Sequence, residues 1–456
     1  MMAKTIAAIS TAMAPGGIGI IRISGPEARQ IADRVFRPAG KRSLLTAKGY
    51  TALFGAVYTA AGEKLDDCVA LVFAAPKSYT GEEVVELSCH GGLYVMKRLL
   101  REVLNAGAVA AEPGEFTRRA FLNGKMDLTQ AEAVMQLIGA NGEQAAKAAV
   151  AGNDGALAKK IGNIREEMTD LAAHLSAWAD FPDEDIPQVE EGRLKTGLEG
   201  AVTSLRALLA GFDTGKLLRE GVSTVIVGKP NAGKSTLMNL LAGCERSIVT
   251  QYAGTTRDVV EETVNLGGVP LRLADTAGLR ETDDPVERIG VAAARDRLKT
   301  AQLVLAVFDA SLQLDGDDRA LMESLPSAYT VAVVNKTDLE GRIELEEIKE
   351  HFSHVAFISA ASGDGLTSLT KEVSALLDTE SFNPADGVLY TERQRADVEQ
   401  ALQSLEEALQ ALHSGMTLDA VTVCVEAGLE ALYSLTGERV SDAVVDEVFS
   451  QFCVGK

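Results

Sequence analysis

The stretch VSTVIVGKPNAGKSTLMNLL, residues 222–241, decides the fold of the central part of this chain. A short β-branched run leads into the pattern GxxxxGKS at 228–235, and a helix is expected directly after it, over Thr236–Leu241. The glycines let backbone N–H groups curl around phosphates, Lys234 reaches the β and γ oxygens, and the Ser235 hydroxyl binds Mg²⁺. A strand, a phosphate loop and a helix in this order predict a P-loop nucleotide-binding domain.

Two further motifs identify the nucleotide. Asn335-Lys336-Thr337-Asp338 has the NKxD pattern, in which the Asp338 carboxylate accepts both N–H groups on the guanine edge. Adenine presents an acceptor at the first of these positions and would leave the carboxylate unpaired, so the ligand is expected to be GTP rather than ATP. Asp275-Thr276-Ala277-Gly278 has the DxxG pattern, whose Asp reaches Mg²⁺ through water and whose Gly amide contacts the γ-phosphate.

Two shorter segments complete the expected nucleotide site. The segment Gly254-Thr255-Thr256-Arg257-Asp258 supplies the remaining Mg²⁺ hydroxyl, which we assign to Thr256, and Ser359-Ala360-Ala361 fits the loop whose backbone touches guanine. Short apolar strands alternate with helices through this region, which predicts a mainly parallel α/β sheet. The expected strands are Thr224–Val227, Leu271–Ala274, Val304–Phe308, Val331–Val334 and Val355–Ile358.

The residue after the DxxG motif departs from the Ras pattern. Small GTPases of the Ras type place a water-orienting Gln there, whereas this chain has Leu279. Either hydrolysis is slow or another group orients the water. Arg257 and Arg280 are candidate arginine fingers, and Glu287 is a candidate carboxylate, with a solvated loop residue as the alternative for Glu287.

Composition and charge narrow the functional class. The chain has 456 residues, of which 46% are hydrophobic and 24% charged, and its length predicts about three globular domains. The net charge of −21 disfavours non-specific nucleic-acid binding, so RNA contact should be local or delivered through a partner. The five cysteines are scattered and form no CxxC pair, which fits a reducing compartment. No apolar run reaches the roughly 18 residues that a membrane span needs, and the N-terminus resembles a signal peptide only loosely. We therefore predict a cytoplasmic protein with no membrane span.

The character of the sequence changes three times along the chain. Residues 1–120 alternate β-rich runs with Gly/Pro turns around one helical stretch near Leu93–Leu104, which predicts an α+β domain. Residues 121–220 and 379–456 have helical apolar spacing, and 221–378 holds the α/β pattern. We therefore predict a multidomain α/β protein in which a discontinuous helical domain receives the P-loop domain as an insertion.

The chain resembles the MnmE (TrmE) family of bacterial tRNA-modification GTPases in the motifs GKPNAGKST, TQYAGTTRD, DTAGLRETDDPVERIG, NKTD and FCVGK. The resemblance extends to PGGIGIIRISG, SYTGEEVVELSCHGG and PGEFTRRAFLNGKMDLTQAEA, and so spans essentially the whole chain. It implies an N-terminal domain that dimerises and binds 5-formyl- or 5,10-methylene-tetrahydrofolate, a helical domain and an inserted Ras-like GTPase domain. It also implies a homodimer that forms a heterotetramer with MnmG, the subunit that carries FAD and NADH. Together the two proteins would add an aminomethyl or carboxymethylaminomethyl group to the wobble uridine of certain tRNAs.

The resemblance also implies roles for individual residues. K⁺ would occupy the position that an arginine finger takes in other GTPases and would stimulate hydrolysis from there. Glu287 would act on the attacking water through a second, bridging water. The implied K⁺ contacts are Asn231, Thr250, Tyr252 and Thr255, and the implied folate contacts are Arg22, Glu86, Lys125 and Lys456. The complete set of expected nucleotide contacts is Asn231, Ala232, Gly233, Lys234, Ser235, Thr236, Thr250, Gln251, Tyr252, Ala253, Gly254, Thr255, Thr256, Asp275, Thr276, Ala277, Gly278, Asn335, Lys336, Thr337, Asp338, Ser359, Ala360 and Ala361.

Two alternatives compete with a GTP-hydrolysing subunit of a tRNA-modification enzyme. A ribosome-assembly switch would only bind RNA, but such a protein normally carries a basic module, whereas residues 379–456 hold 4 basic and 14 acidic side chains. A GTP-gated scaffold would leave all one-carbon chemistry to MnmG. Chemical roles for Cys453 and His90 stay open, although His90 before two glycines is more simply a turn histidine. The sequence identifies neither the tRNAs modified nor the folate form that donates.

Overall fold

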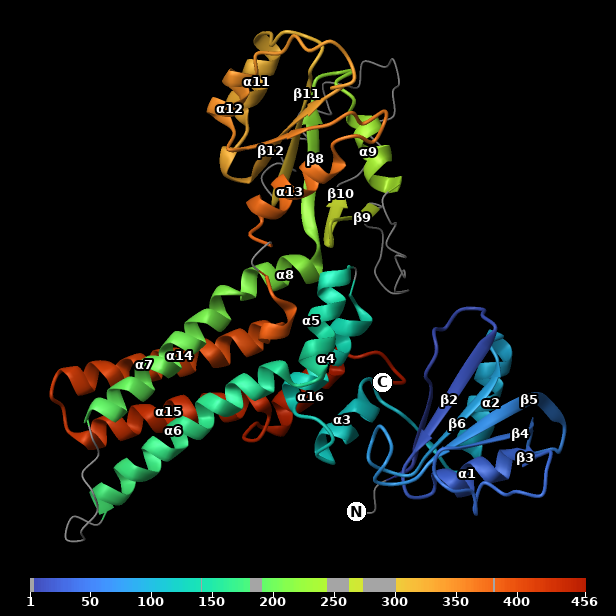
Figure 1. Cartoon of the computed structure of the whole chain (residues 1–456). Coiled ribbons are helices and arrows are strands. Elements are labelled where there is room, and N and C mark those ends of the chain that lie inside the picture. The colour runs from blue at the N-terminus through green and yellow to red at the C-terminus, as the bar shows by residue number, and fades with distance from the viewer. Residues whose placement is uncertain (1–3, 141, 181–190, 244–261, 274–300, 380–381) are drawn as a thin grey trace. The chain divides into compact units, whose positions relative to one another are not determined.

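The computed structural model describes residues 4–140, 142–180, 191–243, 262–273, 301–379 and 382–456 (Figure 1). The chain divides into two compact units, one formed by Met1–Met135 with Glu430–Lys456 and the other by Gln136–Leu429. Within the described ranges, no helix combines the length and the apolarity that crossing a bilayer requires.

The first unit is built on a seven-stranded sheet with the strand order β3-β4-β5-β6-β2-β1-β7. Neighbouring strands pair antiparallel except β1 with β7, which are parallel. In the central pair, Arg22 of β2 lies opposite Glu86 of β6. The strands are β1 (Ile6–Ile9), β2 (Ile18–Ser24), β3 (Phe36–Pro38), β4 (Thr51–Tyr58), β5 (Lys64–Phe73), β6 (Val84–His90) and β7 (Val109–Ala110).

Two helices, α1 (Ala28–Val35) and α2 (Leu93–Asn105), share one core with this sheet. The prediction of a single helix within residues 1–120 is therefore wrong. Helix α1 has apolar residues at the helical spacing i, i+3, i+4 and i+7, all of them buried, but eight residues are too few for the pattern to stand out. Helix α3 (Glu115–Leu122) also begins before residue 120.

The last residues of the chain pack into the first unit. Helix α16 (Asp442–Ser450) places Val445 and Phe449 against Leu128 of α4 (Leu128–Ile138) in a small apolar core. Beyond α16, Val454 forms a β-bridge with Pro113. The two ends of the sequence therefore share one structural unit, which no local pattern indicates.

The second unit contains the helices α5 (Glu143–Asn153), α6 (Ala156–Asp180), α7 (Glu191–Ala210), α8 (Phe212–Glu220) and α14 (Glu392–His413), and most of α15 (Leu418–Thr436). Helix α7 lies along α14 and also contacts α6 (Figure 1). Helices that precede and follow the α/β segment in sequence thus pack side by side, which confirms a discontinuous helical domain.

The α/β part of the second unit has a six-stranded sheet with the order β13-β12-β11-β8-β10-β9, parallel except for the β9–β10 hairpin. Its strands are β8 (Val222–Gly228), β9 (Glu262–Leu266), β10 (Val269–Leu273), β11 (Leu303–Asp309), β12 (Thr330–Asn335) and β13 (His354–Phe357). Residues 303–308 of β11 and every residue of β12 are buried, as expected where helices cover both faces. Helices α9 (Lys234–Gly243) and α13 (Leu366–Leu376) pack on one face, and α11 (Gly316–Ser324) and α12 (Leu345–His351) pack on the other. The five predicted strands fall on β8, β10, β11, β12 and β13, whereas β9 was not predicted.

Two 3₁₀ helices complete the described elements of this unit: η2 (Ser327–Tyr329), which directly precedes β12, and η3 (Pro384–Asp386), which contacts α5 and α6 of the helical part.

Candidate functional site

The predicted phosphate loop joins β8 to α9 and depends on unusual backbone angles. Asn231 and Gly233 have φ of +64° and +97°, in the left-handed region. A Cβ added to Gly233 would lie 2.1 Å from Nδ2 of Asn335, so no other residue fits there without displacing Asn335. The side chain of Asn231 is exposed, while Ala232 is buried.

Lys234 begins α9 and folds back over the loop. Its ammonium group donates to the carbonyls of Gly228 and Lys229 at 2.9 and 2.7 Å. Ser235 and Thr236 follow in the first turn of α9, and both are exposed. A helix N-terminus presents backbone N–H groups and a positive dipole end, so this position favours an anion such as phosphate.

Lys229 ties the phosphate loop to α11. Its ammonium group lies 2.6 Å from Asp315 and 2.7 Å from Asp318, and the two carboxylates also form the capping box of α11. The hydrogen bond from Lys229 lowers the pKa of Asp315 to about 2. Sequence analysis missed this contact because nothing local indicates that α11 begins beside the loop.

Asn335, at the end of β12, connects the phosphate loop with the 359–361 segment. Its Nδ2 donates to the carbonyl of Ala232 and its Oδ1 accepts from the amide of Ala360, both at 2.9 Å. The side chain has little contact with solvent, since Asn335 is only 2% exposed. Three predicted nucleotide motifs are therefore brought together by one buried side chain.

The other residues of the NKxD motif surround this connection. Lys336 has φ of +63° and pairs with Asp309 at 2.6 Å. Burial of Asp309 opposes its ionisation, but hydrogen bonds from Lys336 and Ser311 prevail and lower its pKa. The Thr337 amide donates to the Ile358 carbonyl, and Asp338 is exposed just beyond it.

Within the 359–361 segment, Ser359 and Ala360 are buried and Ala361 is exposed. About half of the predicted site lies outside the described residues. This holds for Thr250, Gln251, Tyr252, Ala253, Gly254, Thr255, Thr256, Asp275, Thr276, Ala277, Gly278 and Glu287, and also for Arg257, Leu279 and Arg280.

In the first unit, three of the four predicted folate contacts lie close together. Nε of Arg22 donates to Oε1 of Glu86 at 2.8 Å, and Nη1 of Arg22 donates to the Gly455 carbonyl at 3.4 Å. Burial lowers the pKa of Lys456, the neighbouring charge of Arg22 lowers it further, and Glu86 acts in the opposite direction. The cationic side chains of Arg22 and Lys456 lie beside the Glu86 carboxylate in a half-buried site, and cationic side chains suit an anionic ligand.

Lys125, the fourth predicted contact, has a different partner. Its ammonium group donates to the carbonyl of Pro76 at 3.2 Å. The structure instead adds two aromatic rings that sequence analysis did not single out. The guanidinium of Arg22 lies 5.6 Å from the ring centroids of both Tyr79 and Phe116.

His90 pairs with Asp66, with Nδ1 of His90 2.7 Å from Oδ1 of Asp66, and the His90 amide donates to Oδ2 at 2.8 Å. Burial acts to raise the pKa of Asp66, but the hydrogen bonds from His90 outweigh it and lower the pKa. These contacts secure the end of β6, which fits a structural role for His90.

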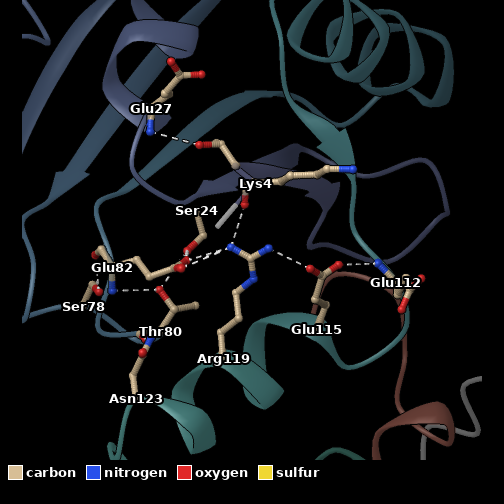
Figure 2. Close-up of polar contacts among 11 residues, drawn as sticks. Lys4, Ser24, Glu27, Ser78, Thr80, Glu82, Glu112, Glu115, Arg119 and Asn123 are labelled. Carbon is tan, nitrogen blue, oxygen red and sulfur yellow. Dashed lines mark hydrogen bonds and ion pairs between the residues drawn. The ribbon is translucent and has the colours of Figure 1, made fainter. Parts of the chain in front are cut away.

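A polar cluster around Arg119 was also missed (Figure 2). Arg119 comes from α3. Thr80 and Glu82 belong to the turn at residues 78–83, and Ser24 belongs to β2. The sequence offers Ser, Thr and Glu in a turn but no sign that an arginine lies opposite them.

Two family models match the chain, the GTP-binding protein TrmE N-terminus over residues 5–125 and the MnmE helical domain over 128–453. The tRNA modification GTPase MnmE of Symbiobacterium thermophilum is 45% identical over 99% of this chain and 99% of that protein. The chain belongs to the MnmE family. Other MnmE proteins are similar over their full length as well. The protein of Synechococcus sp. is 42% identical over 100% of this chain and 99% of its own length. The protein of Bacillus pumilus is 41% identical over 99% of this chain and 100% of its own length.

Membership of the MnmE family confirms the resemblance based on the motifs and the assignment of the chain as a GTPase. Among solved structures, Aquifex aeolicus Era bound to GDP and AlF₄⁻ is similar over 40% of this chain and 66% of that chain, with 28% identity and a TM-score of 0.27. That score is too low to support a structural argument.

Proposed function

We propose that this MnmE-family GTPase hydrolyses GTP with K⁺ stimulation and, together with MnmG, adds an aminomethyl or carboxymethylaminomethyl group to the wobble uridine of certain tRNAs. The one-carbon unit comes from a tetrahydrofolate. The buried Asn335 side chain is the observation that carries the GTP assignment, because it joins the phosphate loop to the NKxD and 359–361 segments. In that arrangement, the Asp338 carboxylate would accept hydrogen bonds from the guanine edge, and the Lys234 ammonium group would contact the phosphates.

The proposed ion sites extend this arrangement. Mg²⁺ is held by Ser235 and Thr256, with Asp275 acting through water. K⁺ is held by Asn231, Thr250, Tyr252 and Thr255. The exposed side chain of Asn231, on a left-handed backbone within the phosphate loop, supports its part in this site. A cation there supplies positive charge to the phosphates, and Glu287 acts as general base through a bridging water.

The proposed folate site lies at Arg22, Glu86, Lys125 and Lys456. The two cationic side chains of Arg22 and Lys456 support it, since folate carries glutamate carboxylates and a pterin carbonyl that such groups can bind. Glu86 can accept hydrogen bonds from pterin N–H groups. The folate, when bound, supplies the one-carbon unit, and these side chains bind and orient it.

We assign residues 1–120 to folate binding and dimerisation, 121–220 and 379–456 to the helical domain, and 221–378 to the GTPase domain. The protein acts in the cytoplasm as a homodimer that joins MnmG, the carrier of FAD and NADH, in a heterotetramer. The strongly negative charge of the chain supports delivery of tRNA through the partner rather than non-specific binding.

Reconstitution tests this function. The full chain, MnmG with FAD and NADH, a tRNA with a wobble uridine, 5,10-methylene-tetrahydrofolate, ammonium or glycine as the amine donor, and either GTP, GDP or ATP are combined in K⁺ buffer. The modified nucleoside is then measured by mass spectrometry. Modification should require GTP and folate. Equal modification with ATP or GDP would contradict the role of GTP hydrolysis, and failure of the chain alone to bind 5-formyl-tetrahydrofolate would favour a GTP-gated scaffold.

A further inference from the structure

Arg119 lies at the centre of a largely buried set of polar contacts in the first unit (Figure 2). Its side chain is 14% exposed. Nη2 donates to Glu115 at 2.8 Å, and Nη1 donates to both carboxylate oxygens of Glu82 at 3.2 Å and to the Lys4 carbonyl at 2.9 Å. One guanidinium thus joins α3 to the turn at residues 78–83 and to the chain just before β1.

The turn at residues 78–83 is held to β2 through Glu82 and Thr80. Ser24 of β2 donates to Oε2 of Glu82 at 2.6 Å, and its hydroxyl lies 2.8 Å from that of Thr80. Asn123 secures the other side of the turn by donating to the Thr80 carbonyl at 2.7 Å. Ser24 lies two residues beyond Arg22, on the same face of β2, so the contacts end one step along the strand from the proposed folate site.

The two segments that Arg119 joins also supply the two rings around Arg22. Tyr79 belongs to the turn, and its hydroxyl lies 2.9 Å from that of Thr117 on α3. Phe116 belongs to α3, and its amide donates to the Lys456 carbonyl at 3.2 Å. A shift between α3 and the turn would therefore move both rings and the backbone of Lys456.

We propose that Arg119 is a positioning residue for the reduced folate. By pairing with Glu82 it holds α3 against the turn at residues 78–83, and so keeps the Arg22 guanidinium beside the rings of Tyr79 and Phe116, ready to meet an anionic group. This inference rests on the proposed folate function of the site. A preorganised cation binds more tightly because less side-chain freedom is lost on binding.

Removing the guanidinium leaves Glu82 without its cation although that carboxylate is only 16% exposed. An uncompensated, partly buried carboxylate is costly, so the turn should move outward to hydrate it. Tyr79 then moves with the turn, and Arg22 loses one of the two rings that confine it. Arg119 acts on the ligand only through these neighbours.

The chain offers a matched control in Arg118, the neighbouring residue on α3. Arg118 also pairs with a carboxylate, that of Asp446 at 2.7 Å, but this partner belongs to α16 and not to the turn at residues 78–83. The test compares Arg119→Gln with Arg118→Gln in the full chain, using equilibrium dialysis of 5-formyl-tetrahydrofolate. Hydrogen exchange of the amides at residues 78–83, measured without ligand, reports on the turn directly.

Arg119→Gln should weaken 5-formyl-tetrahydrofolate binding at least about 10-fold, because Arg22 loses the fixed position in which it would meet the ligand. Amide exchange at residues 78–83 should rise as well, while Arg118→Gln changes the affinity less than about twofold and GTP turnover stays at the wild-type rate in both variants. If Arg119 acts through Arg22, the two changes should not add. The double variant Arg119→Gln with Arg22→Lys should therefore bind 5-formyl-tetrahydrofolate no more weakly than the weaker-binding of the two single variants.

Each contrary result has a separate meaning. Unchanged folate affinity or unchanged exchange in Arg119→Gln, equal losses in the Arg118 and Arg119 variants, or additive losses with Arg22→Lys would overturn this inference alone. A wild-type protein that does not bind 5-formyl-tetrahydrofolate would overturn the proposed folate site together with the inference.

Discussion

Replacing Asn335 by aspartate should separate the phosphate loop from the 359–361 segment, which we propose to contact guanine, while changing a single non-hydrogen atom of the side chain. The Oδ1 of aspartate can still accept from the Ala360 amide. The second oxygen, however, replaces the Nδ2 donor and faces the Ala232 carbonyl at a distance of about 2.9 Å. The new carboxylate oxygen and the Ala232 carbonyl oxygen, both acceptors, would then face each other. Water cannot easily separate them, because residue 335 is only 2% exposed in the wild type.

The size of the effect follows from these contacts. Losing one hydrogen bond costs about 0.5–1.5 kcal/mol, and leaving a buried carbonyl without its donor costs about 1–3 kcal/mol. Together they amount to about 1.5–4.5 kcal/mol, or roughly 10- to 1,600-fold in an equilibrium constant. We therefore expect the GDP affinity of Asn335→Asp to fall at least about 10-fold at neutral pH, because both loops must be in place to bind the nucleotide.

The dependence on pH identifies the cause. Burial raises the pKa of an aspartate at this position, and the protonated carboxyl regains a donor for the Ala232 carbonyl. The loss relative to wild type should therefore shrink as the pH falls from about 7.5 to about 5.5. Fluorescence titration with a labelled GDP measures both ratios on the full chain.

Asn265→Asp is the matched control, since the Oδ1 of Asn265 accepts from the Gly268 amide at 2.8 Å and aspartate keeps that bond. Its GDP affinity should stay within about twofold of wild type. A dissociation constant for Asn335→Asp within threefold of wild type, or a loss that grows as the pH falls, would refute the reasoning.

The other predictions concern hydrolysis, base choice and acid stability. GTP turnover should be faster in KCl than in NaCl at equal ionic strength, and Asn231→Lys should reduce that difference by placing an ammonium near the K⁺ position; equal rates of the wild type in both salts would exclude a K⁺ role. Glu287→Ala should lower kcat at least about 100-fold while GTP affinity changes less than about threefold, and Asp283→Ala should do much less, because a general base acts in the transition state and not on ground-state binding; near wild-type turnover would reduce Glu287 to a solvated loop residue. Asp338→Asn should exchange GTP for XTP affinity, measured by competition binding, since an amide presents a donor where guanine also has one; retained GTP affinity would place guanine recognition elsewhere. The lowered pKa of Asp66 means that its pairing with His90 stabilises the fold above the ordinary aspartate pKa of 3.8 and is lost as the pH falls through the lower folded value. Asp66→Asn should therefore lower the thermal midpoint of the first unit by about 2–4 °C at neutral pH and have a smaller effect in acid, as followed by circular dichroism; an effect that is larger in acid would contradict this sign.

Much of the α/β part was predictable because its determinants are local. The β-branched run of β8, the glycine-rich loop and the start of α9 occupy consecutive residues, and the loop needs a residue without a Cβ at Gly233. Strand β9 was missed because residues 263–266 alternate polar and apolar side chains at the edge of the sheet, whereas the predicted strands are mostly apolar runs. Helix α1 was missed because its eight residues cover little more than two turns.

The sequence by itself determined the GTPase motifs, the α/β sheet and the division into β-rich and helical regions, because periodicity and turn chemistry act over a few consecutive residues. Only the tertiary structure decided which side chains meet. Asn335 reaches a carbonyl 103 residues away, Lys229 a carboxylate 86 residues away, and Arg119 a carboxylate 37 residues away. Such contacts depend on the order of strands in each sheet and on how helices pack against it. A hydrogen bond or ion pair requires its partners to lie within about 3 Å, and a pattern of residue types along the chain carries no information about that distance.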